Sequence, residues 1–115
     1  MKLTADYIYQ NTLKKVKTQV KKISDLSKKI NAELYIVVYP WAETLEFGQE
    51  EFNWSEYVQK ICTKNKCKVI DAIPDFKSYK KNNINWSNEL YFLNDEHFNQ
   101  KGALLLFETV IKNIQ

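Results

Sequence analysis

The chain has 115 residues, a length that fits one domain able to bury a core of its own. Hydrophobic residues make up 44% of it and charged residues 27%, a balance typical of globular proteins that excludes an intrinsically disordered chain. The net charge is only +3 and all seventeen basic residues are lysines, so the arginine fork used in specific nucleic-acid recognition is missing, and we expect no nucleic-acid partner.

The first element that the pattern predicts is a long helix over residues 5–31, with Thr4 as its N-cap. Apolar side chains recur at spacings of three and four residues and form one stripe, made of Tyr9, Leu13, Val16, Val20, Ile23 and Ile30. The lysines lie mostly away from this stripe. We interpret the segment as an amphipathic helix that covers a sheet, in preference to a coiled-coil arm or a membrane-surface helix.

Two strands are predicted next, and both are short. Residues 33–39 are nearly all apolar and rich in β-branched and aromatic side chains, which is typical of a strand buried on both faces. Pro40 ends this strand, because proline has no N–H to donate to a sheet ladder. Residues 66–71 predict the second strand, and residues 90–93 are a weaker third candidate.

The remaining segments complete an α/β pattern. Residues 41–56 are rich in glutamate and aromatic residues and predict a loop, residues 54–63 predict a helix, and residues 74–87 predict a polar loop with one helical turn. A last helix follows the N-cap Asn99, with a predicted buried face of Ala103, Leu106, Phe107, Val110, Ile111 and Ile114. Helices and strands in this order imply right-handed parallel crossovers, so we expect a single domain over residues 1–115 folded as a three-layer α/β/α sandwich with a short parallel sheet.

Cys62 and Cys67 do not decide whether the chain occupies a reducing or an oxidising compartment. Their spacing fits either two reduced thiols or a disulfide that closes a helix-to-strand turn, and the disulfide would imply an oxidising, extracytoplasmic location. With one histidine and no second cysteine pair we expect no metal site, and nothing in the chain calls for an organic cofactor. No apolar run approaches the roughly 20 residues that span a bilayer, so we expect a soluble chain without membrane insertion.

The chemistry concentrates in residues 93–102, Leu-Asn-Asp-Glu-His-Phe-Asn-Gln-Lys-Gly, just before the last helix. His97 is the single histidine of the chain, and Asp95 precedes it by two residues. A histidine can take a proton from a nucleophile and return it to a leaving group, and a carboxylate that accepts from Nδ1–H fixes the tautomer this requires. A surface or helix-capping histidine is the competing interpretation.

This stretch resembles the last sequence block of the SGNH/GDSL hydrolases, which carries the acid and the catalytic base of that family. The order of a long helix, the strand up to Pro40, a variable loop, a helix and a strand ending at Asp71 is similar to the C-terminal half of the family. The resemblance implies an incomplete SGNH (flavodoxin-like) fold, with His97 as the base and Asp95 as the acid. Many members have two residues between acid and base, whereas this chain has one, which resembles the branch that acts on cell-surface polysaccharide acylation.

The nucleophile and the oxyanion donors of that family precede the matched part, and this chain does not supply them. Its serines are Ser24, Ser27, Ser55, Ser78 and Ser87, none of which follows a glycine in a strand-to-helix turn. Ser78 and Ser87 fall in predicted loops and are the weak candidates. We therefore expect the chain alone to be inactive, and a missing N-terminal half or another chain to complete the fold.

The resemblance implies a Ser-His-Asp mechanism on an acyl ester, or O-acyl transfer to a cell-surface glycan. Trp41, directly after the first strand, is the candidate for contact with such a substrate, although a solvated loop pinned by its aromatic residues is the alternative. A non-catalytic α/β binding module, that is, a degenerate or truncated hydrolase, is the competing function. The acyl group, the acceptor and the oligomeric state are left open.

Overall fold

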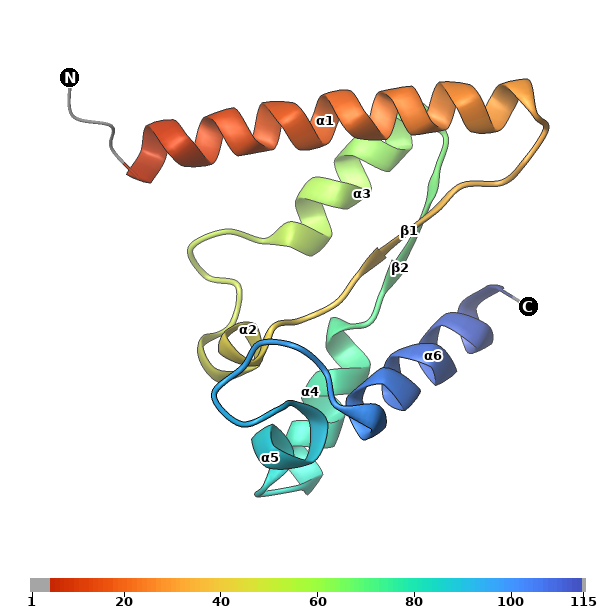
Figure 1. Ribbon diagram of the computed structural model, residues 1–115. Helices are drawn as coiled ribbons and strands as arrows, with labels where there is room; N and C mark the ends of the chain where they lie inside the picture. Colours follow the sequence, from red (N-terminus) through yellow and green to blue (C-terminus); the bar gives the residue numbers. More distant parts are fainter. Residues whose placement is uncertain (1–4, 115) are drawn as a thin grey trace.

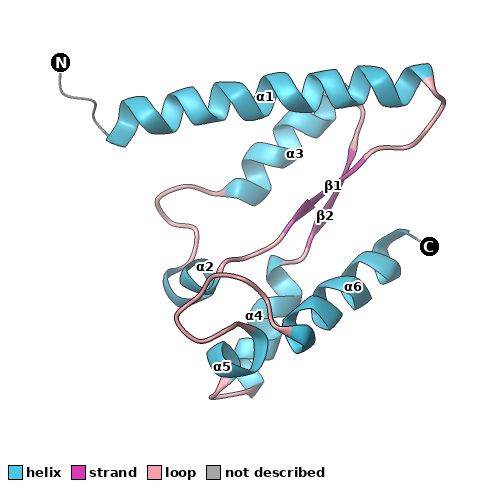
Figure 2. Cartoon of the chain, viewed as in Figure 1, coloured by secondary structure: helices cyan, strands magenta, loops and turns pink. Residues whose placement is uncertain are grey.

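The computed structural model describes the backbone of residues 5–114 and the side chains of residues 10–114. Thr4 and the side chain of Tyr9, which the sequence assigned to the cap and stripe of the first helix, lie outside the described residues. Within the described range the chain forms six helices and two strands (Figure 1 and Figure 2). In chain order these are α1 (Ala5–Lys29), β1 (Tyr35–Val38), α2 (Ala42–Phe47), α3 (Trp54–Asn65), β2 (Lys68–Asp71), α4 (Ile73–Asn82), α5 (Trp86–Leu90) and α6 (Gln100–Ile114).

The strands β1 and β2 pair in parallel, from Tyr35 opposite Lys68 to Val38 opposite Asp71. The segment that carries α2 and α3 connects them, and α3 packs on both strands. Its contact with the sheet is an apolar cluster that includes Val38, Val58, Cys62 and Ile73. The expected α/β class with a parallel sheet is therefore confirmed, as a mostly helical chain with a short two-stranded sheet.

The third strand expected over residues 90–93 is wrong. Leu90 ends α5, and Tyr91 forms one isolated antiparallel bridge with Phe98. The two residues that follow Tyr91 enter the tight loop that carries Asp95 and His97, so the chain turns back before a strand can propagate.

Two segments expected to be loops contain helices. Residues 41–56 hold α2 and the start of α3, which Asn53 caps by accepting from the Glu56 N–H at 3.0 Å. Residues 74–87 hold most of α4 and the start of α5. Pro74 lies in the first turn of α4, where its missing N–H has no intrahelical partner to lose, so this proline is compatible with a helix start.

Helix α1 packs along α3 through a narrower face than the sequence predicted. Leu13, Val20 and Ser24 are buried, whereas Ile23 and Ile30 are exposed. The Ser24 hydroxyl donates to the Asn65 carbonyl at 2.5 Å, so a polar residue occupies the contact because it satisfies the C-terminal end of α3.

A disulfide joins Cys62 and Cys67 across the turn from α3 into β2. Lys66 ends the helix in the left-handed region at φ 59°, and the Cys67 N–H donates to the Cys62 carbonyl at 3.1 Å. Of the two interpretations of these cysteines, the structure therefore has the disulfide. Cys62 is fully buried, and the bridge holds the end of α3 against Cys67, the residue that precedes β2.

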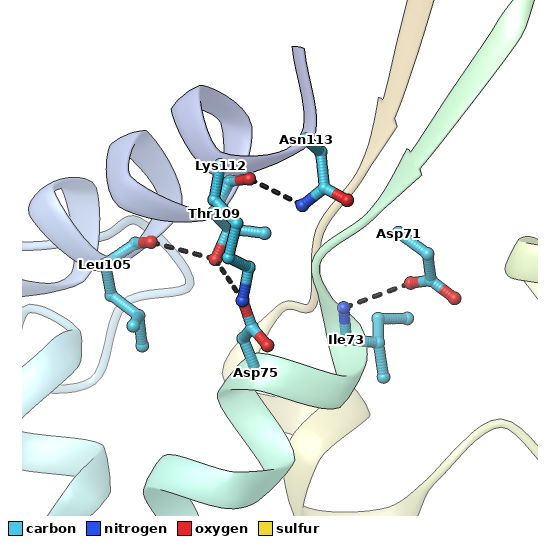
Figure 3. A network of polar contacts seen from close by, with 7 residues as sticks. All are labelled: Asp71, Ile73, Asp75, Leu105, Thr109, Lys112 and Asn113. Atoms are coloured by element: carbon cyan, nitrogen blue, oxygen red, sulfur yellow. Dashed lines mark hydrogen bonds and ion pairs between the residues drawn. The ribbon is translucent and has the colours of Figure 1, made fainter. Parts of the chain in front are cut away.

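A polar network anchors α6 to α4 near the carboxyl end of β2 (Figure 3). Asp75 Oδ2 accepts from the Thr109 hydroxyl at 2.7 Å and from the Lys112 ammonium at 2.8 Å. Asp71 Oδ1 accepts from the Ile73 N–H at 3.0 Å and so stabilises the turn that leads into α4. The network explains why Thr109, a polar residue, is buried on α6.

This network makes part of the stability pH-dependent. The Lys112 ammonium and the Thr109 hydroxyl hold the pKa of Asp75 below its usual value of 3.8. The folded state thus favours the carboxylate, so the contribution is complete above pH 3.8 and is lost as the pH falls through the lower folded pKa. Urea unfolding of Asp75→Asn and the native chain should differ by a constant amount near neutral pH, and the difference should shrink in that acid window. A difference that stays constant throughout the acid range would contradict the assignment.

The molecule is open for its size. Its accessible surface is 8676 Å², whereas a compact monomer of 13.7 kDa exposes about 6,600 Å². The radius of gyration is 15.9 Å, against about 13 Å for a compact chain of this length. Large apolar side chains are exposed on α1, on α6 and around the loop of residues 92–98. Within residues 5–114, no helix is both long and apolar enough to cross a membrane.

Candidate active site

The loop that carries Asp95 and His97 lies at the carboxyl ends of both strands. Tyr39, which follows β1, contacts the ring of Phe98 at a centroid distance of 5.5 Å. Phe76, on the helix that follows β2, stacks on the same ring at 5.1 Å. Ligands of parallel α/β sheets bind at this edge, so the location agrees with a functional loop.

Backbone hydrogen bonds close this loop into a tight turn. The Phe92 N–H donates to the His97 carbonyl, and the Asp95 N–H donates to the Phe92 carbonyl, each at 3.1 Å. Asn94 adopts φ 56°, in the left-handed region that asparagine tolerates better than most residues. The backbone thereby reverses direction between Phe92 and His97.

The reversal brings the carboxylate of Asp95 to the imidazole of His97. Asp95 Oδ1 lies 2.5 Å from His97 Nδ1 and also accepts from the His97 backbone N–H at 2.8 Å. These two bonds, the backbone one first, hold the pKa of the Asp95 carboxyl below its usual value. An ionised Asp95 accepts the proton of Nδ1, which leaves Nε2 as the nitrogen that can exchange a proton with another group. The His97 side chain is 86% exposed, so this nitrogen is accessible.

An aromatic cluster holds the end of the loop. Phe98 packs among the rings of Tyr39, Phe76 and Tyr91. The Tyr91 hydroxyl is buried and donates to the Pro40 carbonyl at 2.7 Å, which ties the loop to the end of β1. Burial raises the pKa of Tyr91, so this phenol stays a hydrogen-bond donor.

The residues that follow His97 fix the start of α6. Asn99 Oδ1 accepts from the Gly102 N–H at 3.0 Å, which agrees with the predicted N-cap. Gly102 is buried against Leu90, and a Cβ at this position would collide with the Leu90 carbonyl oxygen and lie 2.9 Å from Phe98 Cδ1. The loop and the helix can approach each other this closely because residue 102 has no side chain.

The structure places the other candidate residues as follows. Trp41 is exposed at the same edge, where Glu96 Oε2 accepts from the Glu43 N–H at 3.3 Å and joins the His97 loop to the first turn of α2. Ser78 and Ser87 are exposed on α4 and α5, and among the described residues neither forms a hydrogen bond with His97. The described part of the chain contains no group of three metal-ligating side chains.

Sequence reasoning missed the residues that support the pair. Phe76 and Tyr91 come from segments interpreted as a polar loop and a weak strand, and Glu96 was passed over between Asp95 and His97. Phe76 carried one usable signal, because it is an aromatic residue five positions after a strand-ending aspartate. The role of Tyr91 depends on a contact with Pro40, which is remote in the sequence.

The Asp95–His97 pair can accept a proton and return it, but it has no nucleophile bonded to it within the described residues. It has an oriented imidazole with one free nitrogen, and among residues 10–114 no serine or cysteine thiol is hydrogen-bonded to that ring. Comparison with protein-family models, curated proteins and solved structures found no match to this chain.

Proposed function

We propose that the chain supplies the Asp–His pair of an SGNH-type ester-processing site, with the serine nucleophile and oxyanion donors provided by another polypeptide segment. His97 acts first as general base, taking the serine proton, and then as general acid toward the leaving group. Asp95 orients the ring and stabilises the imidazolium, and an acyl-serine forms in between. The single observation that carries the proposal is the bond between Asp95 Oδ1 and His97 Nδ1.

The surroundings of the pair support a catalytic role over a capping role. A histidine that only caps a helix would use its ring to satisfy backbone groups, but here Asn99 performs that task for α6. The His97 ring instead has a carboxylate on one nitrogen, and with the side chain 86% exposed the other nitrogen is open to solvent. The loop is held from behind by Phe98, so its exposed position does not depend on the His97 side chain.

The missing nucleophile and the open architecture support a divided site. On this proposal the chain is the C-terminal portion of a three-layer α/β/α sandwich, and further strands extend the two-stranded sheet. Two-stranded parallel sheets are rarely stable alone, and neither outer edge of this one pairs with a further strand within the described residues. A strand added in parallel would end at the same edge as β1, and its following loop would then face His97.

Trp41 supports a second candidate, O-acyl transfer to a glycan. Its indole is exposed at the edge that carries His97, and Tyr39 and Phe92 are exposed there as well. Exposed aromatic faces suit sugar rings because they combine apolar area with little loss of side-chain freedom. The Cys62–Cys67 disulfide is consistent with an extracytoplasmic site for this reaction.

The test uses a fluorophosphonate probe, which reacts with activated serines, together with p-nitrophenyl acetate as a small acyl ester. The chain alone should take up no probe and should hydrolyse the ester no faster than free imidazole at equal concentration. The chain expressed with the reading frame upstream of Met1 should be labelled on a serine outside residues 1–115. Both labelling and turnover should be lost in His97→Ala and retained in Glu108→Gln, a matched change on the exposed side of α6.

Two results would contradict the proposal. Turnover by the chain alone that His97→Ala abolishes would place the nucleophile within residues 1–115. Labelling of the longer polypeptide that survives His97→Ala would remove His97 from the reaction and favour the binding-module interpretation.

A further inference from the structure

A cavity of about 140 Å³ lies at the amino ends of the two strands, at the opposite end of the sheet from the His97 loop. Its walls come from the last turns of α1, the segment that leads into β1, and the turn between α3 and β2. The C-terminal ends of α1 and α3 meet on this side of the sheet, where the Ser24 hydroxyl donates to the Asn65 carbonyl (Figure 1). The charged residues that line the cavity are Lys28, Lys66, Lys68 and Glu33.

The cavity has an excess of positive charge. Glu33 Oε1 accepts from Lys68 Nζ at 2.8 Å, and Glu33 Oε2 accepts from the Tyr35 hydroxyl at 3.3 Å. The hydrogen bond from Lys68 holds the pKa of Glu33 below its usual value, so this carboxylate is ionised at neutral pH and neutralises one lysine. The ammonium groups of Lys28 and Lys66 form no hydrogen bond or ion pair with any side chain or carbonyl of residues 10–114. Two positive charges at the cavity are therefore not neutralised.

Lys66 occupies a backbone position that favours glycine. It ends α3 with φ 59°, in the left-handed region where a Cβ is unfavourable and where glycine is the usual residue at a helix end. The bond from the Cys67 N–H to the Cys62 carbonyl and the disulfide between these two residues hold the turn in this conformation. A lysine here is less favourable for the backbone than a glycine, and its ammonium has no partner in the described chain that offsets the cost. Backbone positions of this kind concentrate at functional sites in proteins.

The helix ends do not fully explain why Lys28 and Lys66 line the same cavity. Each of them lies at the C-terminus of a helix, where a positive charge interacts favourably with the helix dipole. The dipole accounts for a lysine on each helix separately, but two like charges at one cavity repel each other. An anion in the cavity would replace this repulsion by attraction to both ammonium groups.

The size of the cavity limits what such an anion can be. Pockets that enclose a whole small-molecule ligand have volumes of about 300–1,000 Å³, so a cavity of about 140 Å³ has room for a single charged group. A carboxylate carries one negative charge, whereas a phosphoryl group carries roughly −1.5 to −2 at neutral pH and has three acceptor oxygens. The phosphoryl group therefore matches two free ammonium groups better than a carboxylate does.

We propose that this cavity binds the terminal phosphoryl group of a phosphate monoester. Lys28 and Lys66 neutralise the phosphoryl charge, and Glu33 holds Lys68 at the wall of the cavity. The remainder of the ligand lies outside the cavity, because the volume accommodates the phosphoryl group alone. The site does not depend on the function proposed for His97, since none of its residues belongs to the His97 loop.

Titration of the chain with inorganic phosphate at constant ionic strength, followed by amide NMR, tests the proposal. The native chain should show saturable shifts at residues 28 and 66, and acetate, with a single charge, should bind more weakly. Lys66→Gly should raise the dissociation constant for phosphate at least about tenfold, because one hydrogen bond to a charged group is lost. The same substitution should leave the melting temperature unchanged or raise it, since glycine suits φ 59°, so weaker binding would not result from a damaged fold.

Two further variants complete this test. Lys28→Ala should weaken phosphate binding in the same way, and alanine is a good helix former in the last turn of α1. Lys77→Ala is the matched control, because Lys77 is exposed on α4 away from the cavity and its removal changes the net charge by the same amount. The dissociation constant of this control should equal that of the native chain.

Vesicles distinguish the two sources of such a phosphoryl group. Cosedimentation with mixed vesicles of phosphatidylcholine and phosphatidic acid that Lys66→Gly reduces would identify a lipid head group. Binding of inorganic phosphate without cosedimentation would identify a soluble phosphate ester. The absence of saturable shifts with phosphate overturns the proposal, and so does a dissociation constant that Lys28→Ala and Lys66→Gly leave unchanged or that Lys77→Ala raises equally.

Discussion

Phe76→Ala is expected to lower the free energy of unfolding by about 3–5 kcal/mol. Phe76 is fully buried on α4, in the core cluster that also contains Leu45, Leu90 and Tyr91. Truncation to alanine removes the buried ring and leaves a cavity between α4 and the loop of residues 92–98, which is held through Phe98. Urea unfolding followed by circular dichroism would measure the loss.

The same substitution should also loosen the Asp–His pair. The Phe98 ring would lose its stacked partner at 5.1 Å, so the turn that holds Asp95 against His97 should become more mobile. Amide exchange at the His97 N–H, which donates to Asp95, would report this. Phe92→Ala is the control, because Phe92 is exposed in the same loop and should change stability by no more than about 0.5 kcal/mol. A loss of under about 1 kcal/mol for Phe76→Ala would show that the ring is not part of the core.

Gly102→Ala is expected to destabilise the chain by about 2 kcal/mol, although alanine is the better helix former. Helix propensity alone favours alanine over glycine by up to about 1 kcal/mol. Against this, the new Cβ would collide with the carbonyl oxygen of Leu90, and overpacking of this kind costs about 1–3 kcal/mol or more. The collision should win, because its partner is backbone and cannot turn away as a side chain can.

The direction of the stability change in Gly102→Ala distinguishes helix propensity from the contact with Leu90. Ala103→Gly, the reverse change at the next and exposed position of α6, should cost no more than about 1 kcal/mol. Thermal unfolding of both variants therefore separates propensity from contact. If Gly102→Ala raised the melting temperature, the close approach of α6 to Leu90 would not exist in solution.

The elements that periodicity marks were predictable from the sequence. The long α1, the strand before Pro40, the strand that ends at Asp71 and the helix after Asn99 all formed where local pattern placed them. Each of these depends on side chains within one element and its immediate flanks. The helices α2, α4 and α5 were missed because their polar compositions are shared with loops, and burial of single residues such as Leu45 and Phe76 decides their conformation.

The buried side of each helix was less predictable from the sequence than the presence of the helix. The sequence assigned Ile23 and Phe107 to buried faces, but Ser24 and Thr109 are buried instead. Both polar residues have a hydrogen-bond partner on another helix, Asn65 for Ser24 and Asp75 for Thr109. The spacing of apolar residues along one helix does not reveal such remote partners. Hydrophobic periodicity therefore located the helices and misplaced their contacts by one or two residues.

In the candidate site, too, local features were predictable from the sequence and remote contacts were not. Asp95 and His97 are two residues apart, so one turn determines their geometry and the sequence was sufficient to predict the pair. The residues that hold this turn in place, Phe76 and Tyr91, act across the fold, and only Phe76 had a local signal, its position five residues after the aspartate that ends a strand. A nucleophile is remote from its base in the same sense, and the pair alone does not reveal it.

The parallel register of β1 and β2 has a consequence for how the chain folds. Tyr35 meets Lys68 only after the whole α2–α3 segment has been drawn into a loop, and that closure loses chain entropy before any sheet contact compensates for it. The His97 turn and the Cys62–Cys67 turn span a few residues each and can form on their own at an early stage. We therefore expect acquisition of the sheet to be slower than closure of either turn.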